Sequence, residues 1–173
     1  ALVVTADHGM KPKHDANGKP SVIYVQDILD QWLGQAAARV ILPITDPYVV
    51  HHGALGSFAT AYLPAEVDIT EITEKLSNIE GILLVINKSE AVKRFDLPSD
   101  RIGDIVIIST ENMTLGTSVD RHDLEALKEP LRSHGGLTEQ EVPFIVNRKI
   151  DLPEVPNLRN YDAFFYASIA ANT

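Results

Sequence analysis

The sequence has 173 residues, and its 15 basic against 24 acidic side chains give a formal net charge of -9. A nucleic acid or an anionic membrane would need clustered Lys and Arg, so this balance argues against either partner. The absence of cysteine excludes disulfides and thiolate metal sites, which leaves His, Asp and Glu as possible metal ligands. No apolar run approaches the roughly 20 residues of a membrane span, and no signal-peptide pattern is present, so a soluble chain is expected. The location expected for it is cytoplasmic.

The first element expected is a strand over Leu2–Ala6, which is apolar throughout apart from Thr5. Such a run is typical of a central parallel strand that is buried on both faces. Because the sequence enters this strand without a polar lead-in, we expect the chain to be truncated at its N-terminus. Asp7-His8-Gly9 follows at the carboxyl end of the strand, where open α/β sheets bind their ligands, and a polar loop over residues 11–20 comes next.

The middle of the sequence predicts a mixture of helices and strands with short turns and no internal repeat. A helix is expected from a cap at Ser21 to Leu33, because its apolar residues fall on one face and Gly34 can end it. This mixture of helices and strands indicates a compact α+β unit. The remaining strands are expected at Arg39–Leu42, Gly56–Leu63, Ile82–Ile86 and Ile102–Ser109, and the remaining helices at Ile69–Asn78, Glu90–Phe95 and Arg121–Lys128.

The end of the sequence changes in character after Pro130. A glycine loop at His134-Gly135-Gly136 precedes a short strand over Phe144–Asn147, a proline-rich connection and a final helix for which Asn160 is the expected cap. The helical spacing of one set of side chains predicts a face that packs on a core: Tyr161, Phe164, Phe165, Ser168 and Ile169.

Asp7 and His8 are the most specific pair of functional candidates in the sequence. A carboxylate and an imidazole both suit zinc or a similar divalent ion. In a continuing strand, neighbouring side chains would point to opposite faces, but Gly9 allows a sharp turn after which both could converge. The alternative is structural: Asp7 would cap the next element and His8 would make an ordinary hydrogen bond.

The string Val4-Thr5-Ala6-Asp7-His8-Gly9-Met10 resembles the T-x-D-H-G metal motif of the alkaline phosphatase superfamily. Within that superfamily, most of the chain is similar to the phosphonoacetate hydrolase family. The similarity is carried by Lys13-His14-Asp15, by residues 22–33, by residues 41–53 and by residues 133–144.

The resemblance implies a two-metal site. Asp7 and His8 would bind the ion that also holds the attacking hydroxyl, and His134, from the later His-Gly motif, would be a ligand of the second ion. Two divalent ions are expected, with zinc the foremost candidate. The family's nucleophilic threonine and its other ligands precede the Asp-His-Gly motif, so no catalytic nucleophile is expected in this chain.

Other polar residues have alternative roles. Lys11, Lys13 and His14 are candidates for binding an anionic substrate, against the simpler interpretation of a solvated loop. The spacing of Asp46 from His51 and His52 departs from the family's Asp-x-x-x-His pattern, so we interpret His51 and His52 as buried or interface residues, with metal binding as the alternative.

The fold class expected from the resemblance is α/β, a partial alkaline-phosphatase-like core with an inserted α+β cap. The core would comprise residues 1–18 and 126–173, and the cap residues 19–125. The implied reaction is metal-dependent hydrolysis of the carbon-phosphorus bond of phosphonoacetate to acetate and phosphate. A phosphodiesterase or nucleotide pyrophosphatase, a non-catalytic metal-binding fragment and an acidic interaction domain remain alternatives. A small-molecule phosphonate is the expected partner, and a homodimer is left open.

Overall fold

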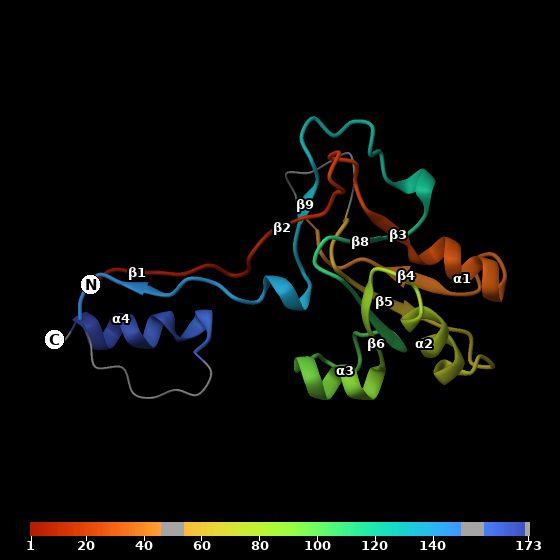
Figure 1. Cartoon of the computed structure of the whole chain (residues 1–173). Coiled ribbons are helices and arrows are strands. Elements are labelled where there is room, and N and C mark those ends of the chain that lie inside the picture. The colour runs from red at the N-terminus through yellow and green to blue at the C-terminus, as the bar shows by residue number, and fades with distance from the viewer. Residues whose placement is uncertain (46–53, 150–157, 172–173) are drawn as a thin grey trace. The chain divides into compact units, whose positions relative to one another are not determined.

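The computed structural model describes residues 1–45, 54–149 and 158–171, which form two compact units (Figure 1). Unit 1 contains Ala1–Gly9 and Glu139–Thr173, and unit 2 contains Met10–Thr138. Asp46, His51 and His52 lie outside the described residues. Among the helices that the structure describes, none is both long and apolar enough to cross a membrane. The expected division into core and cap concerns the family fold and stays a prediction.

Unit 2 is built around a four-stranded antiparallel sheet in the order β4-β5-β7-β6. Its central strand β7 pairs with β5 on one side and with β6 on the other, and all five of its residues are buried. The strands therefore confirm the four predicted in this region, with ends that differ by up to three residues. Their bounds are β4 Arg39–Ile41, β5 Phe58–Tyr62, β6 Ile82–Asn87 and β7 Ile105–Ser109.

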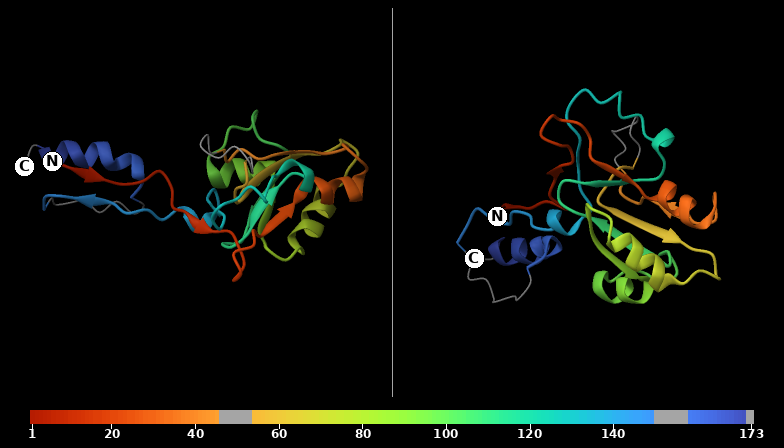
Figure 2. Two further views of the ribbon diagram at one scale, coloured as in Figure 1. Left: turned by 90° about the horizontal axis from the view of Figure 1, so that it is seen from above. Right: turned by 45° about the vertical axis from the view of Figure 1, so that its right-hand side comes forward.

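Two hydrophobic clusters cover the opposite faces of this sheet. Because side chains alternate along a strand, Ile105 and Ile107 of β7 enter one cluster, and Val106 and Ile108 enter the other. The first cluster also contains buried residues of α1 (Val25–Leu33) and α2 (Ile69–Ser77), and the second contains Ala91 of α3 (Lys88–Phe95). Helices therefore pack on both faces, as Figure 2 shows from two directions. This arrangement explains why β7 is a continuous apolar run.

Helix α1 begins later than the sequence predicts. The expected cap at Ser21 is wrong, because Val22, Ile23 and Tyr24 form strand β3 and pair in parallel with β8 (Thr114–Gly116). Two of these three residues are β-branched and fit a strand better than a first helical turn. Inside the helix, the Gln26 amide spans to β4, because Nε2 donates to Ala38 O at 2.9 Å and Oε1 accepts from Val40 N at 2.9 Å.

The helix predicted over Arg121–Lys128 is also wrong. The chain has only the 3₁₀ turn η1 (Val119–Arg121) here, and the next residue, His122, is extended with φ −129° and ψ 106°. His122 is buried, and its Nε2 accepts a hydrogen bond from Thr117 N at 3.0 Å. Asp123 Oδ1 accepts from Ala126 N, so a local side-chain bond takes the place of a helical one.

Unit 1 pairs β1 (Val3–Val4) with β10 (Ile145–Val146) and adds helix α4 (Ala163–Ala171). The ladder is antiparallel and two-stranded, and Val4 is 46% exposed, so the predicted central parallel strand buried on both faces is wrong for this chain. The predicted packing face of the last helix is wrong as well. Tyr166 and Ala170 are buried, whereas Phe164 is 85% exposed, because α4 is apolar all round and β1 covers only part of it.

Two buried threonine hydroxyls in unit 2 give a test of this packing. Thr60 Oγ1 donates to Ile105 O and accepts from Gly103 N, both at 2.9 Å, whereas Thr73 Oγ1 is buried without a partner in the described structure. We expect Thr60→Val to lower the free energy of unfolding by about 1–3 kcal/mol, because two buried groups lose their partner. Thr73→Val should leave it unchanged or raise it. Urea unfolding of both variants checks this, and equal losses would contradict the assignment.

Candidate metal-binding site

The Asp7-His8 pair lies in unit 1, just beyond the end of β1. The strand ends at Val4, so Ala6, Asp7 and His8 are outside the ladder that would turn neighbouring side chains to opposite faces. Gly9 N donates to Glu139 O at 2.7 Å, and a Cβ at Gly9 would meet that same oxygen at 3.3 Å. The glycine predicted to allow a turn therefore also lets two backbone segments approach closely.

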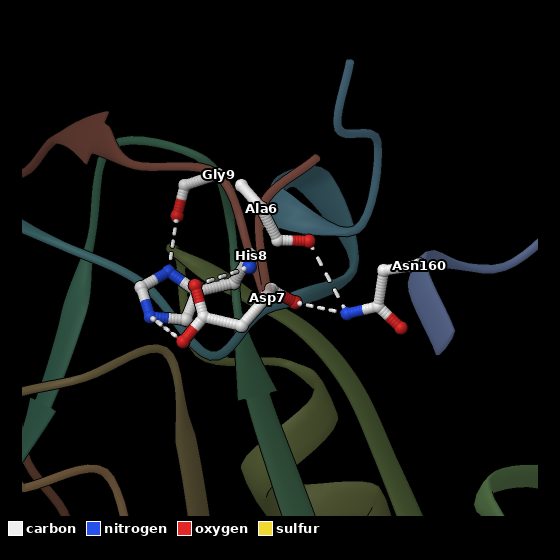
Figure 3. Close-up of polar contacts among 5 residues, drawn as sticks. All are labelled: Ala6, Asp7, His8, Gly9 and Asn160. Carbon is white, nitrogen blue, oxygen red and sulfur yellow. Dashed lines mark hydrogen bonds and ion pairs between the residues drawn. The ribbon is translucent and has the colours of Figure 1, made fainter. Parts of the chain in front are cut away.

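The two predicted ligands converge (Figure 3). Asp7 Oδ2 lies 3.6 Å from His8 Nε2, and Asp7 Oδ1 accepts a hydrogen bond from His8 N at 3.0 Å. His8 Nδ1 lies 2.9 Å from Gly9 O. A carbonyl oxygen can only accept, so Nδ1 carries the proton of this bond. The lone pair of the neutral ring then belongs to Nε2, the atom that faces the carboxylate.

This geometry fits a shared divalent ion. Tetrahedral zinc with ligand bonds of about 2.0–2.2 Å separates neighbouring donor atoms by about 3.3–3.6 Å, and the Asp7–His8 separation is 3.6 Å. Metal-binding histidines almost always donate their other ring N–H to a carbonyl or carboxylate, as Nδ1 does here to Gly9 O. Residue types, spacing and this tautomer are therefore compatible with a two-ligand metal pair.

His134 lies in unit 2, immediately after β9 (Arg132–Ser133), and β9 pairs with β2 (Lys11–Pro12). Two hydrogen bonds hold this segment: Ser133 Oγ donates to Leu55 O at 2.5 Å, and Ser57 N donates to His134 O at 2.9 Å. Ser133 and Ser57 are both buried. The backbone that carries His134 is therefore fixed on both sides by buried partners.

The structure thus brings Asp7 and His8 together within unit 1 and describes His134 within unit 2. No group of three or more His, Asp or Glu side chains arranged for a metal ion occurs in the described ranges 1–45, 54–149 and 158–171. The assignment of all three as metal ligands stays a prediction, supported for the first two by their mutual geometry.

The three substrate-binding candidates lie in unit 2. Lys11 Nζ forms a 2.7 Å ion pair with Glu111 Oε1, and Lys13, which is fully buried, donates from Nζ to Glu111 O at 2.6 Å. Both lysines therefore tie the β2 segment to the turn after β7. His14 Nδ1 lies 2.8 Å from Asp15 O.

The loop after His14 is organised by Asp15. Its carboxylate accepts hydrogen bonds from the backbone of Lys19 and of Asn17, and these bonds hold the pKa of Asp15 below its ordinary value. The polar loop predicted here is therefore an ordered turn.

The residue that sequence reasoning missed is Asn160. It was expected to cap the last helix, but the cap of the 3₁₀ turn η3 (Asn160–Asp162) is Arg159, and Asn160 itself bonds to the Asp-His motif (Figure 3). Nothing in the local sequence marks this role, because the partner segment lies at the other end of the chain.

Gly135 offers a test of the backbone beside His134. Its φ is +99°, and a Cβ at this position would lie 2.6 Å from Ile44 Cγ1. We expect Gly135→Ala to cost roughly 1–3 kcal/mol in backbone strain, and more because Ile44 must move. A smaller metal content should accompany this loss, measured by atomic absorption on the folded protein.

Gly34→Ala is the control for that variant, since Gly34 has a φ of +98° but no atom within 4 Å of an added Cβ. It should cost only the strain and leave the metal content unchanged. If both variants lost the same stability and kept all their metal, the tight packing around Gly135 would have no part in placing His134.

Solved structures similar to this chain agree with the expected family, although no family model matches the chain. Phosphonoacetate hydrolase from Sinorhizobium meliloti 1021, in complex with phosphonoformate, matches with 71% identity and a TM-score of 0.89 over 97% of this chain. The same enzyme in complex with phosphonoacetate matches with a TM-score of 0.88. The chain spans 41% of the length of that enzyme.

A more distant match indicates fold alone. Murine ectonucleotide pyrophosphatase / phosphodiesterase 5 is 23% identical, with a TM-score of 0.51 over 83% of this chain and 32% of its own. The expected fold class, a partial alkaline-phosphatase-like α/β fold, and the expected resemblance to phosphonoacetate hydrolase are confirmed.

Proposed function

We propose that this chain, which is similar to phosphonoacetate hydrolase over 97% of its length, serves the hydrolysis of phosphonoacetate to acetate and phosphate in the natural protein that carries it. The observation that supports this proposal is the 71% identity to an enzyme solved with phosphonoacetate and with phosphonoformate. The match covers 97% of this chain and therefore includes residues of both units.

The reaction balances with water as the co-reactant. An oxygen attacks phosphorus, a P–O bond forms and the C–P bond breaks, and the departing carbon takes up a proton to become the methyl group of acetate. The neighbouring carboxylate of the substrate spreads the charge that develops on this carbon. The reaction therefore calls for stabilisation of negative charge at the phosphoryl oxygens.

We infer that Asp7 and His8 hold one divalent ion and that His134 is a ligand of a second, with zinc as the expected metal. When bound, two such ions would neutralise phosphoryl charge and stabilise both the attacking and the leaving atoms. The inference is supported by the 3.6 Å approach of the Asp7 and His8 donor atoms and by the Nδ1 bond to Gly9 O, which leaves Nε2 as the metal-binding atom.

A role in substrate binding is proposed for Lys11, Lys13 and His14, and their surroundings differ. Lys11 is partly exposed and its charge is paired with Glu111. Lys13 is buried against a carbonyl oxygen, which suits a residue that holds the segment after the Asp-His motif. Of the three, Lys11 and His14 retain enough exposure to meet an anion from solvent.

The direct test is release of acetate and phosphate from phosphonoacetate by the natural protein with added zinc. We expect His134→Ala to lower kcat/KM by more than about 100-fold, because even changes to the partners of metal ligands cost 10–100-fold. Asp7→Ala should do the same. The metal content of each variant, measured alongside, should fall.

Asp100→Ala is the matched control for Asp7→Ala, since Asp100 is also an exposed aspartate and forms an ion pair with the adjacent Arg101 at 3.8 Å. It should keep full turnover and metal content. Hydrolysis of p-nitrophenyl phosphodiesters without turnover of phosphonoacetate would move the function to the phosphodiesterase alternative. Full turnover by His134→Ala would refute the ligand assignment.

A further inference from the structure

Asn160 bonds to two consecutive carbonyl groups of the Asp-His motif. Its Nδ2 donates to Ala6 O at 3.2 Å and to Asp7 O at 3.3 Å, all within unit 1 (Figure 3). Because both partners are carbonyls and only accept, the contacting atom must be the amide nitrogen. Asn160 is partly buried and lies in η3, at the start of the last helical segment.

These two carbonyls control the conformation of the residue between them. The Ala6 carbonyl belongs to the peptide group before Asp7, and the Asp7 carbonyl belongs to the peptide group after it. Each peptide group is planar, so fixing both fixes φ and ψ of Asp7. The direction in which the Asp7 side chain leaves the backbone, and the position of the His8 Cα relative to it, are therefore restrained by a single distant amide.

Described backbone hydrogen bonds flank the motif on both sides. The β1–β10 ladder ends at Val4, and Gly9 N donates to Glu139 O. Between these two points, Asn160 supplies the hydrogen bonds described for the Ala6 and Asp7 carbonyls, groups that would otherwise need water. It is within this segment that Asp7 Oδ2 and His8 Nε2 lie 3.6 Å apart.

We propose that Asn160 is a positioning residue for the Asp7-His8 metal pair, acting through the backbone and without touching the ion. The proposal rests on the proposed function in one respect, namely that Asp7 and His8 hold a divalent ion. Its expected consequence is a contribution to metal affinity of the size that supporting partners of metal ligands make, about 10–100-fold.

The test uses Asn160→Asp, which has nearly the same shape but presents oxygen where the amide N–H donors were. Its carboxylate cannot donate to Ala6 O or Asp7 O and would repel both. In the natural protein carrying this sequence, we expect the dissociation constants for Zn²⁺ and Co²⁺, measured by competition with a chromophoric chelator, to rise about 10–100-fold. The visible absorption of bound Co²⁺ should change, because the ligand geometry loosens.

Asn147→Asp is the matched control. Asn147 also bonds from its side chain to the N-terminal segment, but there its Oδ1 accepts from Leu2 N at 2.8 Å, and a carboxylate can still accept. This variant should bind both ions within about twofold of the unmodified protein, a change too small to count against the 10–100-fold effect expected at Asn160. Asn160→Ala, which removes the donor without adding charge, should weaken binding in the same direction as Asn160→Asp and guards against a folding failure caused by the new charge.

The outcomes separate the two proposals. If Asp7→Ala abolishes binding of one ion while both Asn160 variants keep the affinity and Co²⁺ spectrum of the unmodified protein, the positioning role is overturned and the ligand assignment stands. If Asp7→Ala and His8→Ala bind Zn²⁺ unchanged, both are overturned. A lower melting temperature of the Asn160 variants with an unaltered Co²⁺ spectrum would assign Asn160 to stability alone and also refute the positioning role.

Discussion

In both units, a short antiparallel ladder joins segments that lie far apart in the sequence. In unit 1, Val3 and Val4 pair with Val146 and Ile145, and in unit 2, Lys11 and Pro12 pair with Ser133 and Arg132. Each ladder has only two residues on each strand, so its own hydrogen bonds contribute modestly. The entropic free-energy cost of closing a loop grows slowly, by about 0.6 kcal/mol for each doubling of the loop length. In unit 2, the β4-β5-β7-β6 sheet and its two hydrophobic clusters supply the packing that offsets the entropy cost of bringing β2 and β9 together.

The candidate ligands lie next to these closures. Asp7 and His8 follow β1, and His134 follows β9, so each is placed by a ladder and by a few specific bonds beyond it. This placement makes side-chain position sensitive to distant backbone partners, since a two-residue ladder alone leaves the following residues free to turn. Gly9, Ser133 and Asn160 supply those extra restraints at three different points.

The sequence was sufficient for elements whose pattern is decided locally. Helices α2 and α3 have capping residues that accept from the first turn, Asp68 and Asn87, and the β7 run is apolar because both of its faces are covered. It failed where a distant partner overrides local preference. Residues 22–24 became a strand because β8 pairs with them, and residues after Arg121 did not form a helix because buried His122 bonds to Thr117 while extended.

The candidate site shows the same division between local and distant information. The Asp-His-Gly string could be recognised because the candidate ligands and the glycine that allows the turn are consecutive residues. The two side chains do converge in the structure. Asn160 could not be recognised, since an asparagine before a helix is most often a cap and its actual partners lie more than 150 positions away. A motif therefore specifies which atoms can bind a metal. The backbone around those atoms contacts residues that only the fold makes neighbours, such as Asn160, and no motif marks these residues in the sequence.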